Sequence, residues 1–403
     1  MTHRLVFLAA GMSVALAATA CSDEKLVSPP VPAYTGGALF LRYVAMGNSF
    51  TAGFQSGGIN DSTQKQSYAV LVAAAMGSPF YYPSLALPGC PPPITNIFTN
   101  PPTRLAGATA TTCALRGTPI PPFLTNVAVP GASVLDALKN GPGPGTNSNA
   151  LTLLMLGGRT QTQAMQAAQP TFVSVWFGNN DLLGAAEAGD TTLATDTATF
   201  HANYAHVLDS IKATGASALL IAVGLGHLAN NVAPPFFSRG STWYGLWLSG
   251  AFAPAPFTVT TNCAPPRGDT VLVSFPYGFG LLGAAKGGTP ATLDCTAAPV
   301  VEPRETLFFS RLQLEYNAII QAEAAARSWA FTDSVNSTLD SLAGVPNQFA
   351  PFPGAPAACS GSPFGLAFSC DGLHPAGTTQ RLIARKLVRA INAKYGSSIP
   401  AVP

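Results

Sequence analysis

Residues 171–181 read TFVSVWFGNND, an apolar run that ends directly in glycine, two asparagines and aspartate. Consecutive residues rich in valine and aromatic side chains are typical of a strand that is buried on both faces, and such strands belong to parallel sheets covered by helices. Open parallel sheets bind ligands at the carboxyl ends of their strands. The stretch therefore predicts an α/β fold and marks the sheet edge where a functional site would lie.

Similar runs on either side alternate with helical segments. Residues 39–46 (LFLRYVAM) and 216–223 (ASALLIAV) predict two more buried strands, and residues 126–129 and 329–332 predict shorter ones. Helices are expected over residues 67–76, 132–139, 196–213 and 302–327, and in a closing helix with Leu382, Ile383, Leu387 and Ile391 on one face. This alternation predicts one domain from about residue 35 to residue 403, with a parallel sheet between layers of helices.

An insertion from about residue 226 to 300 breaks the alternation. Between Phe236 and Phe279 it carries ten aromatic side chains. They could form a cap over the site that contacts acyl chains. A membrane hairpin is disfavoured because Pro254 and Pro256 interrupt an already short apolar run. A small separate core closed by a disulfide is the preferred interpretation.

The composition limits the classes of partner. Only 9% of the 403 residues are charged, and the net charge is +2. No basic stripe is present that would follow a phosphate backbone, so nucleic acid is not expected as a partner. With 47% hydrophobic residues the chain can bury a sizeable core, and its 39 glycines and 36 prolines predict long, turn-rich connections.

The N-terminus has the features of an export signal. Arg4 precedes an apolar run, residues 5–18, that is too short to span a bilayer. The run ends in Ala-Thr-Ala-Cys, which resembles a bacterial lipobox with Cys21 as the acylated residue. Residues 1–20 would then be a signal peptide and residues 21–34 a lipid-anchored tether, although ordinary cleavage after Ala20 stays open because Ala18 stands where a lipobox usually has leucine. Both alternatives predict an exported bacterial protein, either anchored at the outer membrane or cell surface or secreted.

The other six cysteines fit an oxidising compartment. Six cysteines allow many pairings, but these form three separate local groups in segments rich in proline and glycine. We therefore expect the disulfides Cys90–Cys113, Cys263–Cys295 and Cys359–Cys370. A metal site is the competing interpretation, and the absence of Cys-x-x-Cys together with scattered histidines disfavours it.

Four short polar features follow or adjoin the predicted elements. They are Gly47-Asn48-Ser49-Phe50, Pro130-Gly131-Ala132, Gly178-Asn179-Asn180-Asp181 and Asp371-Gly372-Leu373-His374. Each alone is weak, because a glycine after a strand is usually part of a turn. Together, in this order, they resemble the four sequence blocks of the GDSL/SGNH hydrolases. The resemblance implies a flavodoxin-like three-layer sandwich with a mostly parallel five-stranded sheet.

The resemblance also implies a reaction, the hydrolysis of carboxylic esters through an acyl-serine intermediate, without cofactor or metal. Ser49 would be the nucleophile and His374 the base that takes its proton. Asp371 would orient the imidazole, although an aspartate that only shapes the loop is an alternative, since some of these enzymes hold the histidine through backbone carbonyls. The oxyanion hole would consist of the backbone N–H groups of Ser49 and Gly131 and the side-chain amide of Asn180.

The sequence departs from the family pattern at two places. Asn48 stands where the family name has aspartate, and asparagine can bond a turn in the same way. The insertion is also larger than in compact members, which weakens any inference about the substrate. The rival α/β-hydrolase fold is disfavoured because no Gly-x-Ser-x-Gly occurs in the chain.

Two alternatives to ester hydrolysis remain at this stage. Acyl transfer to a lipid or glycan hydroxyl uses the same groups and would need the insertion to exclude water. A non-catalytic surface-binding lipoprotein on the same fold would have no need of Ser49, Asn180 and His374 together. The expected partners are thus an ester substrate and, through Cys21, a membrane.

Overall fold

The computed structural model describes residues 37–141, 143, 146, 150–224, 236–350 and 358–403. All of them belong to one unit, residues 34–403. The predicted signal peptide and the whole predicted tether, which begins at Cys21, lie outside the described residues.

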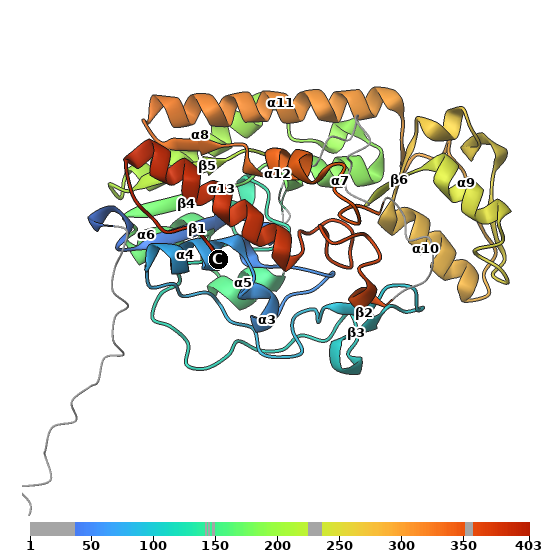
Figure 1. The fold of residues 1–403 in the computed structure, drawn as a ribbon, viewed down its shortest axis with the longest axis horizontal. Coiled ribbons are helices and arrows are strands. Elements are labelled where there is room, and N and C mark those ends of the chain that lie inside the picture. The colour runs from blue at the N-terminus through green and yellow to red at the C-terminus, as the bar shows by residue number, and fades with distance from the viewer. Residues whose placement is uncertain (1–36, 142, 144–145, 147–149, 225–235, 351–357) are drawn as a thin grey trace, which may run out of the picture. The chain divides into compact units, whose positions relative to one another are not determined.

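The described part is an α/β fold around a parallel sheet (Figure 1). The sheet has the order β1 (Tyr43–Gly47), β4 (Phe172–Trp176), β5 (Ser217–Ile221) and β11 (Ala330–Thr332). Every residue of β1 and β4 is buried, which is why the sequence shows unbroken apolar runs there. The four strands confirm the α/β prediction.

The fifth predicted strand, residues 126–129, is present only as a partly paired segment. It runs beside β1, with the N–H of Val127 donating to the carbonyl of Ala45 at 2.9 Å and the N–H of Val129 donating to that of Gly47 at 3.2 Å. Pro130 follows and has no N–H to continue the ladder. The sheet of the described residues therefore has four regular strands, and the five-strand prediction is corrected to that extent.

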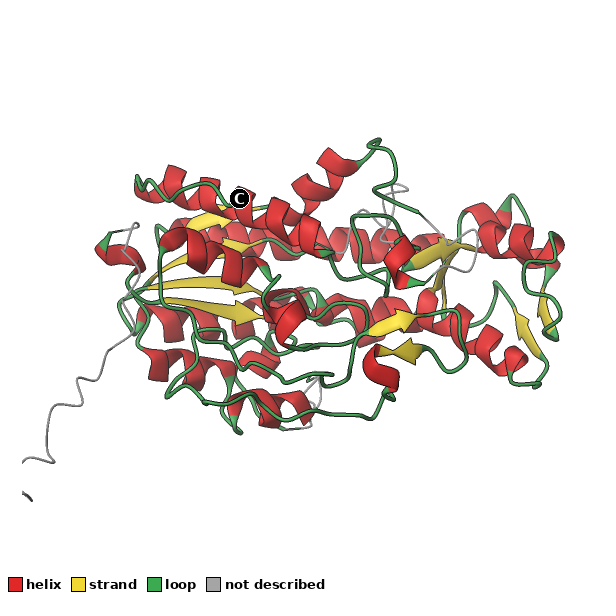
Figure 2. Ribbon diagram, turned by 60° about the horizontal axis from the view of Figure 1, so that its bottom comes forward, coloured by secondary structure: helices red, strands yellow, loops and turns green. Residues whose placement is uncertain are grey.

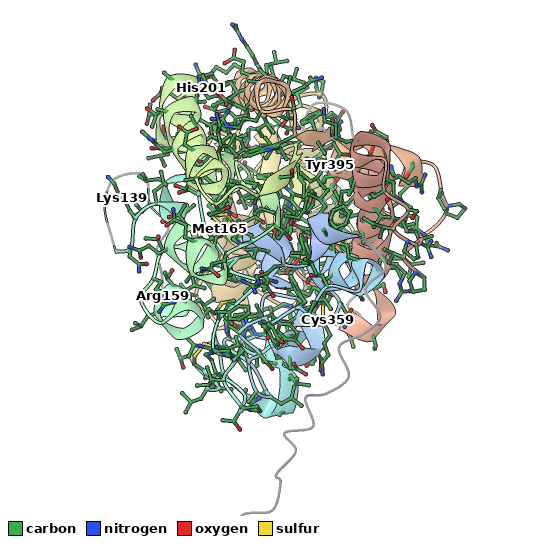
Figure 3. All side chains as sticks on the ribbon, turned by 90° about the vertical axis from the view of Figure 1, so that its left-hand side faces the viewer. Lys139, Arg159, Met165, His201, Cys359 and Tyr395 are labelled. Carbon is green, nitrogen blue, oxygen red and sulfur yellow. A yellow bond between two sulfur atoms is a disulfide. The ribbon has the colours of Figure 1, made fainter. Side chains whose placement is uncertain are left out.

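Helices cover both faces of the sheet because successive strand residues point to opposite sides. One face packs against α4 (Tyr68–Met76), α12 (Ser334–Leu342) and α13 (Gly377–Tyr395). The other packs against α5 (Ala150–Leu156), α6 (Gln161–Ala168), α8 (Thr197–Lys212) and α11 (Pro303–Ala326). Figure 3 shows the two layers, with Met165 of α6 and His201 of α8 on one side and Tyr395 of α13 on the other.

One predicted helix does not form. Residues 132–139 contain only a 3₁₀ turn, Leu135–Ala137. The N–H and hydroxyl of Ser133 both donate to the carboxylate of Asp136, and the N–H of Val134 donates to that of Asp181. Side-chain acceptors thus satisfy these N–H groups in place of a helical ladder.

The described part of the insertion has a core of its own. It comprises an antiparallel sheet, β6 (Phe237–Arg239), β8 (Leu272–Ser274) and β10 (Val300–Val301), and a parallel pair, β7 (Phe257–Val259) and β9 (Ala291–Leu293). Helices α9 (Gly240–Leu248) and α10 (Phe275–Lys286) complete it, and Figures 1 and 2 show these elements at one end of the sheet. Its buried cluster includes Trp243, Phe257 and the Cys263–Cys295 disulfide.

These contacts favour the separate-core interpretation of the insertion. Within the described ranges, no helix combines the length and apolar character needed to cross a bilayer. The structure also contains the other two expected disulfides, Cys90–Cys113 and Cys359–Cys370.

Candidate active site

Ser49 stands at the first residue of a short helix that begins immediately after β1. This helix, α2 (Ser49–Ala52), is capped by Asn48, whose side-chain oxygen accepts the N–H of Phe50 at 3.1 Å. Asparagine thus performs the turn-bonding role expected of it. Gly47 has φ +155°, and a Cβ there would lie 2.4 Å from Thr51 Oγ1 and 2.8 Å from the Trp176 carbonyl oxygen. Glycine is therefore required for β1 to turn into α2 beside β4.

The structure brings Ser49, His374 and Asp371 into one hydrogen-bonded chain. His374 Nε2 lies 2.9 Å from Ser49 Oγ, and His374 Nδ1 lies 2.8 Å from Asp371 Oδ2. The imidazole is buried and packs against the rings of Phe50 and Phe54, with centroids 5.4 and 4.9 Å away. Base and nucleophile are thus within proton-transfer distance.

Asp371 is held as an ionised acceptor. Its Oδ1 accepts the N–H groups of Leu373 and His374 at 3.0 and 2.9 Å, and its Oδ2 accepts the N–H of Gly57 at 2.7 Å. Burial alone would raise the pKa of Asp371, but the charge and hydrogen bonds of His374 outweigh it and lower the pKa to about 2. This geometry supports the orienting role over a purely loop-shaping one.

The expected oxyanion donors lie around the same cavity as Ser49. The cavity has a volume of about 140 Å³, and its lining includes Ser49, Gly131, Asn180 and His374. Asn180 begins α7 (Asn180–Ala188), and its Nδ2 donates one hydrogen to the Ala132 carbonyl at 2.9 Å. That bond fixes the amide beside Gly131, and the second hydrogen on Nδ2 can serve a ligand oxygen.

Three buried carboxamides hold the nucleophile turn, and the sequence patterns did not single them out. Gln161 on α6 accepts the N–H of Gly47 at 2.9 Å and donates to its carbonyl at 2.8 Å. Asn126 donates to the Thr51 carbonyl, and Gln380 on α13 donates to that of Phe50. A glutamine or asparagine with apolar neighbours is the available signal, since a buried amide requires partners.

Two acidic residues of α7 have displaced pKa values. The Oδ2 of Asp181 accepts the N–H of Val134 at 3.0 Å, and burial raises the pKa of Asp181 to about 7. Burial also raises the pKa of Glu187 to about 7, while the charge of His374 lowers it. In the described ranges no three His, Cys, Asp or Glu side chains cluster to hold a metal.

Comparison with known proteins gives a family match in sequence. A family model described as GDSL-like Lipase/Acylhydrolase matches residues 43–247, which include Ser49, Gly131 and Asn180 and end before Asp371 and His374. No curated protein matches the chain.

Solved structures similar to this chain include Axe2 and TesA. Axe2, an acetylxylan esterase from Geobacillus stearothermophilus, has a TM-score of 0.39 and 12% identity over 89% of this chain and 95% of that one. TesA has a TM-score of 0.36 and 12% identity over 88% of this chain and 99% of that one.

Proposed function

This chain belongs to the GDSL-like lipase/acylhydrolase family, whose chemistry is the hydrolysis of esters, and we propose that it acts as a serine esterase with Ser49 as nucleophile. The observation that carries this proposal is the chain of hydrogen bonds from Asp371 through His374 to Ser49 at the wall of one cavity. A purely structural serine would not need a buried histidine and an ionised carboxylate aligned behind it.

In the first half of the reaction Ser49 Oγ attacks the carbonyl carbon of the ester. His374 Nε2 takes the hydroxyl proton and then gives it to the leaving alcohol. Asp371 keeps the other ring nitrogen protonated and stabilises the imidazolium. The N–H groups of Ser49 and Gly131 and the amide of Asn180 would stabilise the oxyanion. Water then attacks the acyl-serine with His374 as base, which releases the acid.

A fluorophosphonate probe tests the nucleophile directly. Folded wild-type protein should be labelled at Ser49, whereas Ser49→Ala should not be labelled. Ser249→Ala, which removes an exposed serine of the insertion, is the matched control and should be labelled like wild type. Failure of folded wild-type protein to react would favour the non-catalytic binder. Ester turnover with and without an alcohol acceptor would separate hydrolysis from acyl transfer.

We also propose that the protein is exported and attached to a membrane by acylation of Cys21. The sequence Ala-Thr-Ala-Cys after a short apolar run supports this proposal. Pairing of six other cysteines as disulfides is in keeping with an oxidising compartment.

A further inference from the structure

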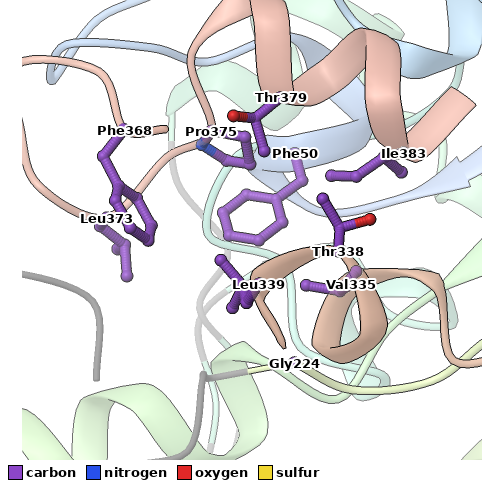
Figure 4. A pocket seen from close by; sticks show the side chains of 10 residues that line it. All are labelled: Phe50, Gly224, Val335, Thr338, Leu339, Phe368, Leu373, Pro375, Thr379 and Ile383. Carbon is purple, nitrogen blue, oxygen red and sulfur yellow. The ribbon is translucent and has the colours of Figure 1, made fainter. Parts of the chain in front are cut away.

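A second, apolar cavity lies next to the proposed active site. It is enclosed by Phe50, by Val335 and Leu339 on α12, by Ile383 on α13, and by the loop that carries Phe368 and Leu373. Figure 4 shows these side chains around the space, with Phe50 near its centre and none of the labelled lining residues charged. A lining of this kind favours an apolar ligand group over an ordered water.

The two cavities share a wall. Phe50 and Leu373 line both of them, and these residues are the immediate neighbours of Ser49 and His374 in sequence. The ring of Phe50 is held edge-on by Trp176, with centroids 5.1 Å apart. Phe50 and Leu373 thus separate the two cavities, and a group that reaches the apolar cavity from the active site would have to pass these two side chains beside Ser49 and His374.

The depth of the apolar cavity is fixed by close packing at its far side. A Cβ at Gly224, just beyond β5, would lie 2.5 Å from Val335 Cγ1, so the backbone after β5 touches α12. Asn336 on α12 adds a hydrogen bond from its Nδ2 to the Val223 carbonyl at 3.1 Å. These contacts prevent α12 from moving away without loss of packing and hydrogen bonding.

The difference in volume between the two cavities indicates the length of the acyl chain that the smaller one can hold. The apolar cavity has about 20 Å³ available, against about 140 Å³ in the cavity around Ser49. One water-sized group occupies roughly 10–15 Å³ by this measure. We infer that the apolar cavity binds the end of a short, unbranched acyl chain of about four carbons, while the alcohol part lies in the larger cavity. The inference rests on the proposed esterase function and names its substrate class.

The test is the dependence of kcat/KM on acyl length with p-nitrophenyl acetate, butyrate and octanoate. Each methylene buried in the cavity should raise kcat/KM about fourfold. Wild type should therefore prefer butyrate to acetate by roughly tenfold or more, and octanoate should fall below butyrate. Leu339→Phe should reduce the ratio of butyrate to acetate to about one, and Leu339→Ala should move the optimum to longer chains.

Leu342→Ala is the matched control, because Leu342 is a buried leucine on the same helix that does not line the cavity. It should keep the wild-type ratios. Circular dichroism verifies the folding of each variant. If Leu339→Phe does not fold, the acyl-length profiles of wild type and Leu339→Ala still show whether the apolar cavity sets the preferred acyl length. Equal ratios in all variants, or octanoate as good as butyrate in wild type, would overturn the inference alone. Absence of turnover with every ester would overturn the proposed function and the inference with it.

Discussion

The position of Ser49 depends on three buried amide side chains that bond the backbone on either side of it. Gln161 bonds both backbone groups of Gly47, and Gln380 and Asn126 bond the carbonyls of the next turn. Each amide is buried among apolar groups and would cost free energy without these partners. They hold the turn in one conformation, so that the Ser49 hydroxyl meets Nε2 of His374.

Asn180→Ala should lower kcat by roughly 10²–10³-fold with little change in KM, because the amide would contribute mainly to the charged transition state. Steady-state kinetics on one ester measures the effect. Asn100→Ala is a suitable control, since the Asn100 amide bonds the Gly283 carbonyl in the insertion and takes no part in the site. A near-normal kcat in Asn180→Ala would remove this residue from the oxyanion hole.

Asp371 should make stability depend on pH in the acid range. Its pKa is lowered from 3.8 to about 2 in the folded protein. Its contribution, about 2 kcal/mol, is therefore fully present above pH 4 and is lost as the pH falls from about 4 to 2. Urea unfolding at pH 6, 4 and 2 should show the stability difference between wild type and Asp371→Asn shrink by this amount.

Wild type must be compared with Asp371→Asn because other carboxyl groups change the stability of the protein with pH in the opposite direction. Burial raises the pKa of Asp181 from 3.8 to about 7, so its contribution to stability is fully present below pH 3.8 and is lost as the pH rises from there to about 7. A difference between wild type and Asp371→Asn that stays constant down to pH 2 would contradict the predicted ionisation of Asp371.

At the scale of elements, the sequence predicted the strands better than the helices. β1, β4 and β5 are buried on both faces, so their apolar runs are unambiguous. Helix α12 was not predicted, because its sequence SVNSTLDSL is rich in residues that favour caps and turns. It forms because Val335, Leu339 and Leu342 pack in the core beside α13, a tertiary contact that local patterns do not contain.

Removal of the Cys359–Cys370 disulfide should lower both stability and activity. A loop of this length contributes about 3 kcal/mol in the chain-entropy model. Cys370 directly precedes Asp371, and its N–H donates to the Ser56 hydroxyl at 3.1 Å. A looser loop would misplace Asp371 and His374, so we expect kcat/KM to fall about tenfold or more in the double serine variant.

The Cys263–Cys295 disulfide provides the matched control, because it lies in the separate core of the insertion. Its double serine variant should lose similar stability and keep kcat/KM. Thermal unfolding and ester turnover of the two variants measure both quantities. Equal activity in the two variants would show that the loop does not depend on its disulfide.

At the scale of the whole molecule, the site joins segments that are far apart in the chain. The sequence singled out Ser49, Gly131, Asn180 and His374, which all line one cavity in the structure, because parallel strands bring their carboxyl ends together. It could not supply the apolar cavity beside them, since that space depends on how α12, α13 and the loop before His374 pack. The described part of the insertion has its own buried cluster and also packs Phe236, Phe237 and Phe275 into the main core, but none of its described residues lines either cavity.

The proposed acylation of Cys21 predicts where the protein is found in the cell. Wild-type protein should fractionate with membranes, and its processing should be blocked by globomycin. Cys21→Ser should be released in soluble form with unchanged ester turnover, because the site lies within residues 47–374. Soluble release of the wild-type protein would contradict acylation and favour an ordinary signal peptide.

The distance along the chain between Ser49 and His374 has a consequence for the timing of activity. The two residues are 325 positions apart, and α13 follows the second. Synthesis begins at the N-terminus and adds about 5–20 residues each second, so roughly 15 to 65 seconds separate the appearance of the serine from that of its base. A nascent chain therefore holds the serine without its partner. The proposed pair can cleave a bond only after His374 has been synthesised and has folded beside Ser49.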